Sequence, residues 1–354
     1  MRRKSLPIPF IVLFALGTAP AACAPVIRAA GVVNAASFRP AEFSGGGLAQ
    51  GALATAFGTG LGPGTGVSAT VYPLASTLAG VGVRLTQGAN SVNAYPVFVV
   101  AGQVNFLVPS NTPLGPTEVR VTYNNETSAP ITVQIVKSAF GLFTFTQGTS
   151  RAVAQNFVSG AETPVNLPTL PAKPGQTLIA YGTGLGPIAG ADNVAAPTGD
   201  IAGAQVEILV GGVPARRVYA GRSPCCSGLD QIVFELPNNA PAGCTVPLVV
   251  RVDGVYSNLG DISISSDGAK CTDPAGGGGT QLCREGTGGV LQLIGGFSQA
   301  APQFYTSDLL RESVFNSFFG QLVRISGCVD LPSAGVGSCT VITSDRPPSQ
   351  PQPT

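Results

Sequence analysis

The sequence predicts an all-β protein made mainly of two tandem β-sandwiches, followed by a small C-terminal β-rich domain. The first observation is composition: of 354 residues, 44% are hydrophobic and 10% charged, with 47 glycines and 30 prolines. A chain this apolar can form packed cores, and its many turn-forming residues favour short strands. The other two observations are a set of motifs that occurs twice and strand-like alternation within each copy.

Composition also limits the functions that the chain can have. It contains no histidine and no tryptophan, and its net charge is +1. Without histidine there is no Ser-His-Asp or Cys-His nucleophile and no imidazole metal site. The near-zero charge gives no electrostatic footprint for nucleic acid. We therefore expect a non-catalytic protein with no cofactor and no nucleic-acid partner.

The N-terminus predicts export. The basic start MRRK precedes an apolar run that ends in small residues, which is the layout of a secretory signal peptide cut after Ala21. The run is too short for a membrane span and is interrupted by proline and glycine. We expect residues 1–24 to be a signal peptide and the mature protein to be secreted or at the cell surface, without a transmembrane span. Lipidation at Cys23 is the minority alternative, because Pro20 stands where lipoprotein signals carry leucine.

The same motifs occur in the same order in two halves of the chain. They are FGTGLGP and YGTGLGP (57–63 and 181–187), AGVGVRL and AGAQVEI (79–85 and 202–208), QVNFLVPSNTPLG and QIVFELPNNAPAG (103–115 and 231–243), and finally Ser128 and Ser257. This order indicates a tandem duplication of a unit of roughly 100 residues, the size of an immunoglobulin domain. We assign the copies to residues 31–137 and 138–265.

Each copy alternates apolar and polar residues with the period of a half-buried strand. The apolar positions are Val119, Val121 and Tyr123, then Ile131, Val133 and Ile135 in the first copy, and Val206, Ile208 and Val210, then Leu248, Val250 and Val252 in the second. Short alternating strands between proline and glycine turns predict two-sheet sandwiches of immunoglobulin type.

The repeated glycine phrase has two interpretations, a phosphate-binding loop or a turn that each copy needs. Its glycines fall at alternate positions, whereas the dinucleotide fingerprint requires G-x-G-x-x-G, and Pro63 and Pro187 prevent the helix that should follow. We therefore expect a turn, with Leu61 and Leu185 capping the ends of the sandwiches. The structural turn glycines are Gly58, Gly60, Gly62, Gly182, Gly184 and Gly186.

Taken together, a strand, G-x-G-x-G, a small hairpin, Q-I-x-F-x-L-P-x-x-x-P-x-G and two closing strands resemble the IPT/TIG type of immunoglobulin-like domain. The stretch GVVNAASF (31–38) ahead of two such copies also resembles an uncharacterised tandem region at the C-terminal end of large secreted bacterial proteins. The resemblance covers residues 31–265, but no large domain lies upstream in this sequence. It implies a sandwich used in adhesion, as a spacer or beside catalytic domains, and it carries no catalytic residues.

Eight cysteines in an exported chain predict disulfides rather than a metal site. Cys271 and Cys283 flank one glycine-rich loop, and Cys328 and Cys339 flank another. Each pair is expected to close its own loop.

The second copy contains an insertion, RSPCCSGLD (222–230), and also has Cys244 where the first copy has proline. A bridge from Cys225 or Cys226 to Cys244 would explain why both features occur together. Adjacent cysteines are poor partners for each other, so the second of the pair is left to bond elsewhere or to remain a reactive thiol.

After the second copy the repeat is lost. We assign residues 266–285 to a glycine-rich linker, 286–345 to a small β-rich domain similar to an OB-fold, and 346–354 to a disordered tail. Within the small domain, strands are expected at 289–296 and 302–307 and a short helix at 307–320.

Potential sites are few. Asp192, Asn193 and Asp200 share a loop and offer oxygen ligands for calcium, but they match no known ligand spacing, so we expect a solvated loop and no metal.

The function expected from the sequence is therefore adhesion, binding or a structural role outside the cell. The partner is an extracellular protein or glycan of unknown identity, and the oligomeric state is open. The alternatives are an accessory protein that binds a carbohydrate or small ligand and, more remotely, a hydrolase that uses carboxylates alone.

Overall fold

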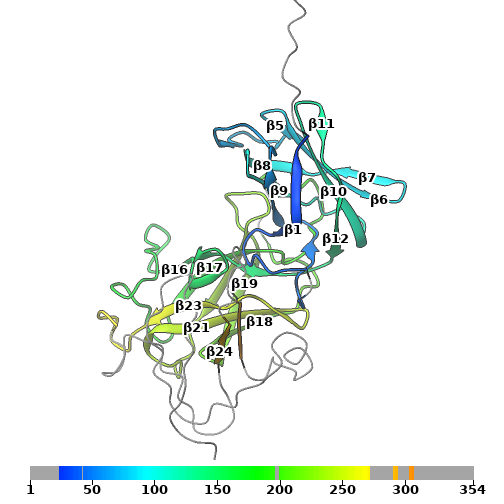
Figure 1. Cartoon of the computed structure of the whole chain (residues 1–354). Helices are drawn as coiled ribbons and strands as arrows, with labels where there is room; N and C mark the ends of the chain where they lie inside the picture. Colours follow the sequence, from blue (N-terminus) through cyan, green and yellow to red (C-terminus); the bar gives the residue numbers. More distant parts are fainter. Residues whose placement is uncertain (1–23, 42, 196–198, 272–289, 294–302, 307–354) are drawn as a thin grey trace, which may run out of the picture.

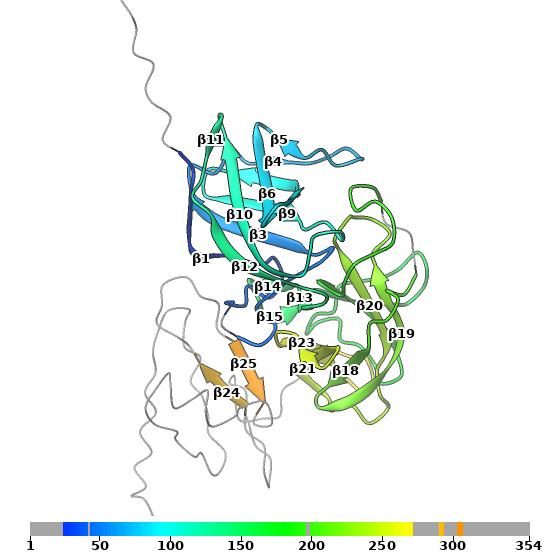
Figure 2. The ribbon, with the colours of Figure 1, turned by 90° about the vertical axis from the view of Figure 1, so that its right-hand side faces the viewer.

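The computed structural model describes residues 24–41, 43–195, 199–271, 290–293 and 303–306. Within these ranges every regular element is a β-strand, which confirms the all-β class. The strands of residues 26–264 form two bodies, blue to teal and green to yellow, stacked end to end in both views (Figures 1 and 2). The protein is thus built of two tandem immunoglobulin-like β-sandwiches.

The first sandwich contains the strands β1 (Val26–Asn34), β2 (Leu48–Ala49), β3 (Leu53–Thr59), β4 (Val67–Ser68), β5 (Thr77–Leu78), β6 (Val81–Gln87), β7 (Asn90–Asn93), β8 (Tyr95–Val100), β9 (Gln103–Leu107), β10 (Gly115–Tyr123), β11 (Glu126–Thr127) and β12 (Ile131–Val136). One sheet has the order β1-β3-β9-β8-β4 and the other β2-β12-β10-β6-β5. Strand β7 pairs with β6, and β11 pairs with β10.

The second sandwich contains β13 (Gly141–Leu142), β14 (Thr144–Thr146), β15 (Thr149–Ala152), β16 (Ala154–Asn156), β17 (Thr177–Thr183), β18 (Val206–Val210), β19 (Val213–Arg222), β20 (Asp230–Glu235), β21 (Gly243–Val252), β22 (Val255–Tyr256) and β23 (Gly260–Ile264). Its strands follow one path, β13-β17-β20-β19-β18-β21-β23-β15-β14, with β16 beside β17 and β22 beside β21. Strand β19 joins the two layers, because residues 213–215 pair with β18 and residues 216–222 pair with β20.

Each sandwich has its own core, and the predicted alternation supplies it. Val119 and Val121 of β10 are fully buried in the first core, and Leu248 and Val250 of β21 are fully buried in the second. Removing each of these side chains from water contributes about 1.5–3 kcal/mol. The apolar face predicted for these strands is therefore confirmed.

The duplication is visible in detailed hydrogen bonding. The Ser128 hydroxyl accepts the Val121 amide at 3.0 Å, and the Ser257 hydroxyl accepts the Val250 amide at 3.1 Å. In both copies this serine follows the hairpin after a central strand and holds the returning chain against it.

The ends of the described chain differ from the expected boundaries. Strand β1 begins before residue 31, and the second sandwich continues past residue 265 to Cys271, whose amide donates to the Pro168 carbonyl at 3.0 Å. Further on, β24 (Val290–Leu293) pairs with β25 (Gln303–Thr306), as expected for strands at 289–296 and 302–307.

Several expectations lie outside the described residues. They are most of the signal peptide with Cys23, the linker from residue 272, the helix at 307–320, the tail, and Cys283, Cys328 and Cys339. The part of the chain that the structure describes contains no helix with the length and hydropathy of a membrane span.

The glycine phrases end β3 and β17 and do not open helices in either copy. Positive φ angles occur at Gly60 (65°), Gly184 (104°) and Gly186 (136°). Leu61 and Leu185, which follow the turn glycines, are 0% and 1% exposed and pack into the cores of their sandwiches. A Cβ at Gly58 would lie 2.0 Å from the Val26 carbonyl oxygen, so this glycine allows β1 to approach β3.

Gly184→Ala is expected to lower the free energy of unfolding by about 1–3 kcal/mol. Its φ of 104° disfavours any side chain, and a Cβ would lie 2.3 Å from the Ala139 carbonyl oxygen. Urea unfolding measures the effect. The matched control is Gly64→Ala, since a Cβ there meets no heavy atom within 4 Å and the backbone is not left-handed. Equal losses in the two variants would contradict the interpretation.

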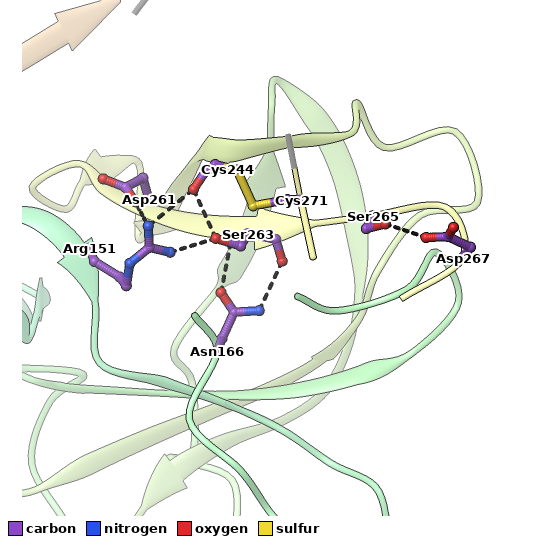
Figure 3. Close-up of a disulfide and its surroundings, with 8 residues drawn as sticks. All are labelled: Arg151, Asn166, Cys244, Asp261, Ser263, Ser265, Asp267 and Cys271. Atoms are coloured by element: carbon purple, nitrogen blue, oxygen red, sulfur yellow. Dashed lines mark hydrogen bonds and ion pairs between the residues drawn. A yellow bond between two sulfur atoms is a disulfide. The ribbon is translucent and has the colours of Figure 1, made fainter. Parts of the chain in front are cut away.

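One disulfide joins Cys244 to Cys271 at a Cα–Cα distance of 5.4 Å (Figure 3). The Cys244 carbonyl also accepts hydrogen bonds from the Ser263 hydroxyl at 2.8 Å and from Arg151 at 3.1 Å. The expected bridge from Cys271 to Cys283 is therefore wrong. Cys271 is held against the second sandwich, and its partner is set by this packing rather than by the nearest cysteine in sequence.

The second disulfide joins the neighbours Cys225 and Cys226, so the expectation that adjacent cysteines would not pair is wrong. The expected bridge from one of them to Cys244 is also wrong. Strand β20 runs between the insertion and the segment before Cys244, which places these cysteines at opposite ends of the strand. At about 3.3 Å per residue this separation exceeds the roughly 7 Å between Cα atoms that a disulfide allows.

Candidate functional site

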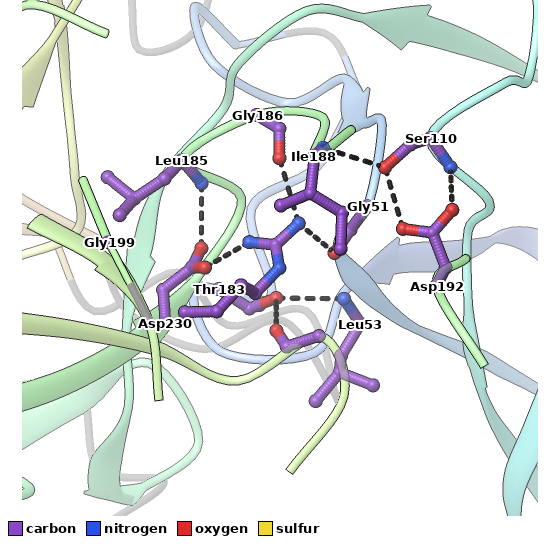
Figure 4. Close-up of polar contacts among 12 residues, drawn as sticks. Gly51, Leu53, Ser110, Thr183, Leu185, Gly186, Ile188, Asp192, Gly199 and Asp230 are labelled. Carbon is purple, nitrogen blue, oxygen red and sulfur yellow. Dashed lines mark hydrogen bonds and ion pairs between the residues drawn. The ribbon is translucent and has the colours of Figure 1, made fainter. Parts of the chain in front are cut away.

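A buried polar cluster lies where the two sandwiches meet, and its centre is Arg222 at the end of β19. Arg222 is 1% exposed and is the largest fully buried side chain in the described part of the chain. Its Nη2 donates to the carbonyls of Gly51 in the first sandwich and Gly186 in the second, both at 2.8 Å. Figure 4 shows these carbonyls converging from the two bodies. One guanidinium thus binds both domains.

Asp230, at the start of β20, forms a salt bridge with Arg222 and is 0% exposed. Its other carboxylate oxygen accepts the Leu185 amide at 2.8 Å, which ties the second glycine phrase to the same cluster (Figure 4). Burial raises the pKa of the Asp230 carboxyl, while the charge of Arg222 and the backbone amides oppose this rise. A charge in this position is stable only because its partner is in place.

Thr183, the last residue of β17, bridges the junction through its hydroxyl. The oxygen accepts the Leu53 amide of the first sandwich at 2.8 Å, and the hydroxyl donates to the Gly228 carbonyl at 2.7 Å. The bond from the Leu53 amide to Thr183 is drawn in Figure 4. Thr183 is fully buried, so each polar atom in this contact is satisfied within the protein.

Asn34, from the stretch GVVNAASF, is the counterpart on the first sandwich. It is 1% exposed, and its Nδ2 donates to the carbonyls of Ala139 at 3.0 Å and Thr183 at 3.3 Å. Its Oδ1 accepts the amides of Ala36 at 2.8 Å and Ser37 at 3.0 Å. The motif that marked the first copy in the sequence is therefore a turn that contacts the second domain.

Asp192 lies on a further contact between the domains and is buried, so the solvated loop expected here is wrong for this residue. Its two oxygens accept the Ser110 amide at 2.7 Å and hydroxyl at 2.6 Å, and Ser110 Oγ accepts the Ile188 amide at 3.0 Å (Figure 4). Asn193 donates to the Leu74 carbonyl at 3.1 Å. The third calcium candidate, Asp200, accepts the Ala220 amide at 2.7 Å. Among the described residues no cluster of three or more acidic, cysteine or histidine side chains could hold a metal.

The insertion RSPCCSGLD (222–230) builds much of this junction, since it begins with Arg222 and ends with Asp230. Between them, the Ser227 amide donates to the Tyr72 hydroxyl of the first sandwich at 3.1 Å. The cysteines make the insertion recognisable in the sequence, but the sequence pattern did not predict that Arg222 and Asp230 hold the two sandwiches together. The available signal was that Asp230 stands before Gln231 where the first copy has Gly102 before Gln103.

No protein-family model matches the chain, and no curated protein matches it significantly.

Solved structures show low-level similarity. The plexin A4 extracellular region is 14% identical over 71% of this chain and 19% of its own, with a TM-score of 0.24. SGBP-B from a xyloglucan utilization locus in Bacteroides uniformis is 12% identical over 66% and 48%, with a TM-score of 0.20. Domains 5–6 of the S-layer protein SbsC are 12% identical over 68% and 98%, with a TM-score of 0.22. The chain thus spans about a fifth of the plexin region and about half of SGBP-B.

Proposed function

We propose that this chain is an exported, non-catalytic protein in which two sandwiches of IPT/TIG type act as one rigid unit for extracellular binding, adhesion or support. The observation that carries the proposal is Arg222, which is buried between the sandwiches and bonded to both. Domains joined by small polar interfaces usually move relative to one another. A buried guanidinium opposes such motion, because opening the junction would break its bond to the Gly51 carbonyl of the first sandwich and expose the charge pair to water.

The polar groups of the junction support a mechanical role rather than catalysis. The carboxylates of Asp192 and Asp230 are both occupied by hydrogen bonds that join or order the sandwiches. A hydrolase using two carboxylates needs one to donate a proton and another to attack or activate water at the substrate. Neither of these buried acids is available for that task. With no histidine in the chain, the non-catalytic function is favoured.

The rigidity is tested by hydrogen exchange on the mature chain. The Leu53 amide crosses the junction to Thr183, so its exchange is expected to be as slow as that of the core amide of Val121, with both limited by unfolding of the whole unit. Thermal unfolding is correspondingly expected to show one transition. Fast exchange at Leu53 beside slow exchange at Val121, or two separate transitions, would contradict the proposal.

Export is tested separately by N-terminal sequencing of the protein recovered outside the cell. The mature chain is expected to start after Ala21.

A further inference from the structure

A shallow recess of about 680 Å³ lies on the first sandwich, next to the junction. Its lining includes Arg28, Phe38, Phe57, Thr59 and Gly102 from the first sandwich and Gln147 from the loop between β14 and β15 of the second. Sites for small ligands have volumes of about 300–1,000 Å³ and combine apolar walls with a few polar groups. This recess is in that range, and Gln147 of the second domain completes its lining.

The apolar wall consists of two phenyl rings. Phe38 and Phe57 have ring centroids 6.1 Å apart, with an interplanar angle of 31°. Phe38 has a φ of 52°, and a bulky residue in this left-handed region is under strain unless its surroundings fix it. The Asn34 carbonyl accepts the Phe38 amide at 3.0 Å, and the Asn34 side chain orders the rest of the turn. The turn thus holds a strained residue at the recess.

The positive charge of the recess comes from Arg28. Its guanidinium carbon lies 5.5 Å from the Phe57 ring centroid, in a cation–π geometry that orients the group. Arg28 is exposed, and among the described residues it forms no ion pair with an acid. None of the lining residues is acidic. An oriented guanidinium of this kind is suited to a carboxylate, which it can bind through two parallel hydrogen bonds.

The second copy does not repeat this arrangement. Tyr181 stands where the first copy has Phe57, and its hydroxyl donates to Gln155 Oε1 at 2.7 Å. Burial raises the pKa of the Tyr181 hydroxyl. The aromatic side chain at this position of the second copy is thus engaged by its own sandwich, whereas Phe57 faces Arg28 and the recess.

We propose that the recess binds a uronic acid residue of an extracellular polysaccharide. Arg28 pairs with the sugar carboxylate, the rings of Phe38 and Phe57 contact the C–H face of the sugar, and Gln147 and Thr59 hydrogen-bond its hydroxyls. The mixture of phenyl rings, an amide and a hydroxyl beside one cation suits a polyhydroxylated anion better than a purely acidic chain. This inference deepens the proposed binding role and rests on it.

Calorimetric titration of the mature chain tests the inference with three probes. An oligogalacturonate is expected to bind, and its methyl ester, which lacks the charge, is expected to bind at least tenfold more weakly. A poly-glutamate peptide of equal charge is expected not to bind. Equal binding of the oligogalacturonate and its methyl ester, equal binding of poly-glutamate, or no binding of the oligogalacturonate would overturn the inference.

Variants distinguish the recess from the rest of the surface. Arg28→Gln is expected to weaken oligogalacturonate binding at least tenfold, and Phe57→Leu, which keeps most of the apolar volume, severalfold. The control is Arg84→Gln, because Arg84 is an exposed arginine on β6 of the same sandwich. An equal loss in Arg84→Gln would point to general charge attraction and contradict the site. Leu53 amide exchange in each variant reports on the rigid junction separately, so either idea can fail alone.

Discussion

Arg222→Met is expected to lower the free energy of unfolding by about 3–5 kcal/mol, the loss found when one partner of a buried ion pair is removed. The variant keeps most of the side-chain volume but leaves the Asp230 carboxylate buried without its cation. The carbonyls of Gly51 and Gly186 also lose their shared donor. Urea unfolding followed by circular dichroism measures the change, and the Leu53 amide is expected to exchange faster.

Two controls sharpen this prediction. Adding Asp230→Asn to Arg222→Met removes the uncompensated charge, so the double variant is expected to recover part of the lost stability. Arg216→Gln removes an exposed ion pair with Glu235 on the neighbouring strand and is expected to leave the unfolding midpoint almost unchanged. If Arg222→Met unfolded at the same urea concentration as Arg216→Gln, the junction would not depend on the buried guanidinium.

Replacing Cys244 and Cys271 together with serine is expected to destabilise the protein by about 3–4 kcal/mol. Their disulfide closes a loop with a sequence separation of 27, so its loss gives the unfolded chain much more freedom. The end of the second sandwich at Cys271 is expected to loosen as well. Urea unfolding under non-reducing conditions measures the loss, and peptide mapping of the unreduced protein is expected to recover the Cys244–Cys271 pair.

The matched control is the double replacement of Cys225 and Cys226 with serine. This disulfide has a sequence separation of 1, so it restrains almost none of the unfolded chain, and the expected change in stability is much smaller. Similar losses in the two double variants would contradict the loop-closure explanation. A mapped peptide joining Cys271 to Cys283 would contradict the connectivity itself.

The sandwiches could be predicted from the sequence because their signals are local. A strand with one buried face must alternate, as Val119 and Val121 do, and this pattern is readable without knowing its partner strand. Because the unit is duplicated, each predicted strand and turn is supported by two copies of its motif. The positions of Leu61 and Leu185 at the ends of the sandwiches followed from the same repeated phrase.

The junction was much harder to predict because its residues meet across the fold. Arg222 and Asp230 lie in an insertion with no periodic pattern, and their contacts with Gly51 and Gly186 depend on how the two bodies stack. The cysteine pairing failed for the same reason. Distance along the chain favoured Cys283 as the partner of Cys271, whereas the packing of the second sandwich brought Cys244 to it.

The RSPCCSGLD insertion occurs in the second unit alone, and this gives the pair a polarity. In the first unit, Gly51 lies in the turn that contacts Arg222, and its amide donates to the Val108 carbonyl at 2.8 Å. At the equivalent position of the second unit, the Gly175 amide donates to the Leu236 carbonyl at 2.9 Å. Both units thus have the same kind of turn at this end, but the arginine that binds such a turn, Arg222, belongs to the second unit. Exchanging the order of the units along the chain would place Arg222 and the Gly51 turn at opposite outer ends, where they could not meet. The two units are therefore not interchangeable, despite their common origin.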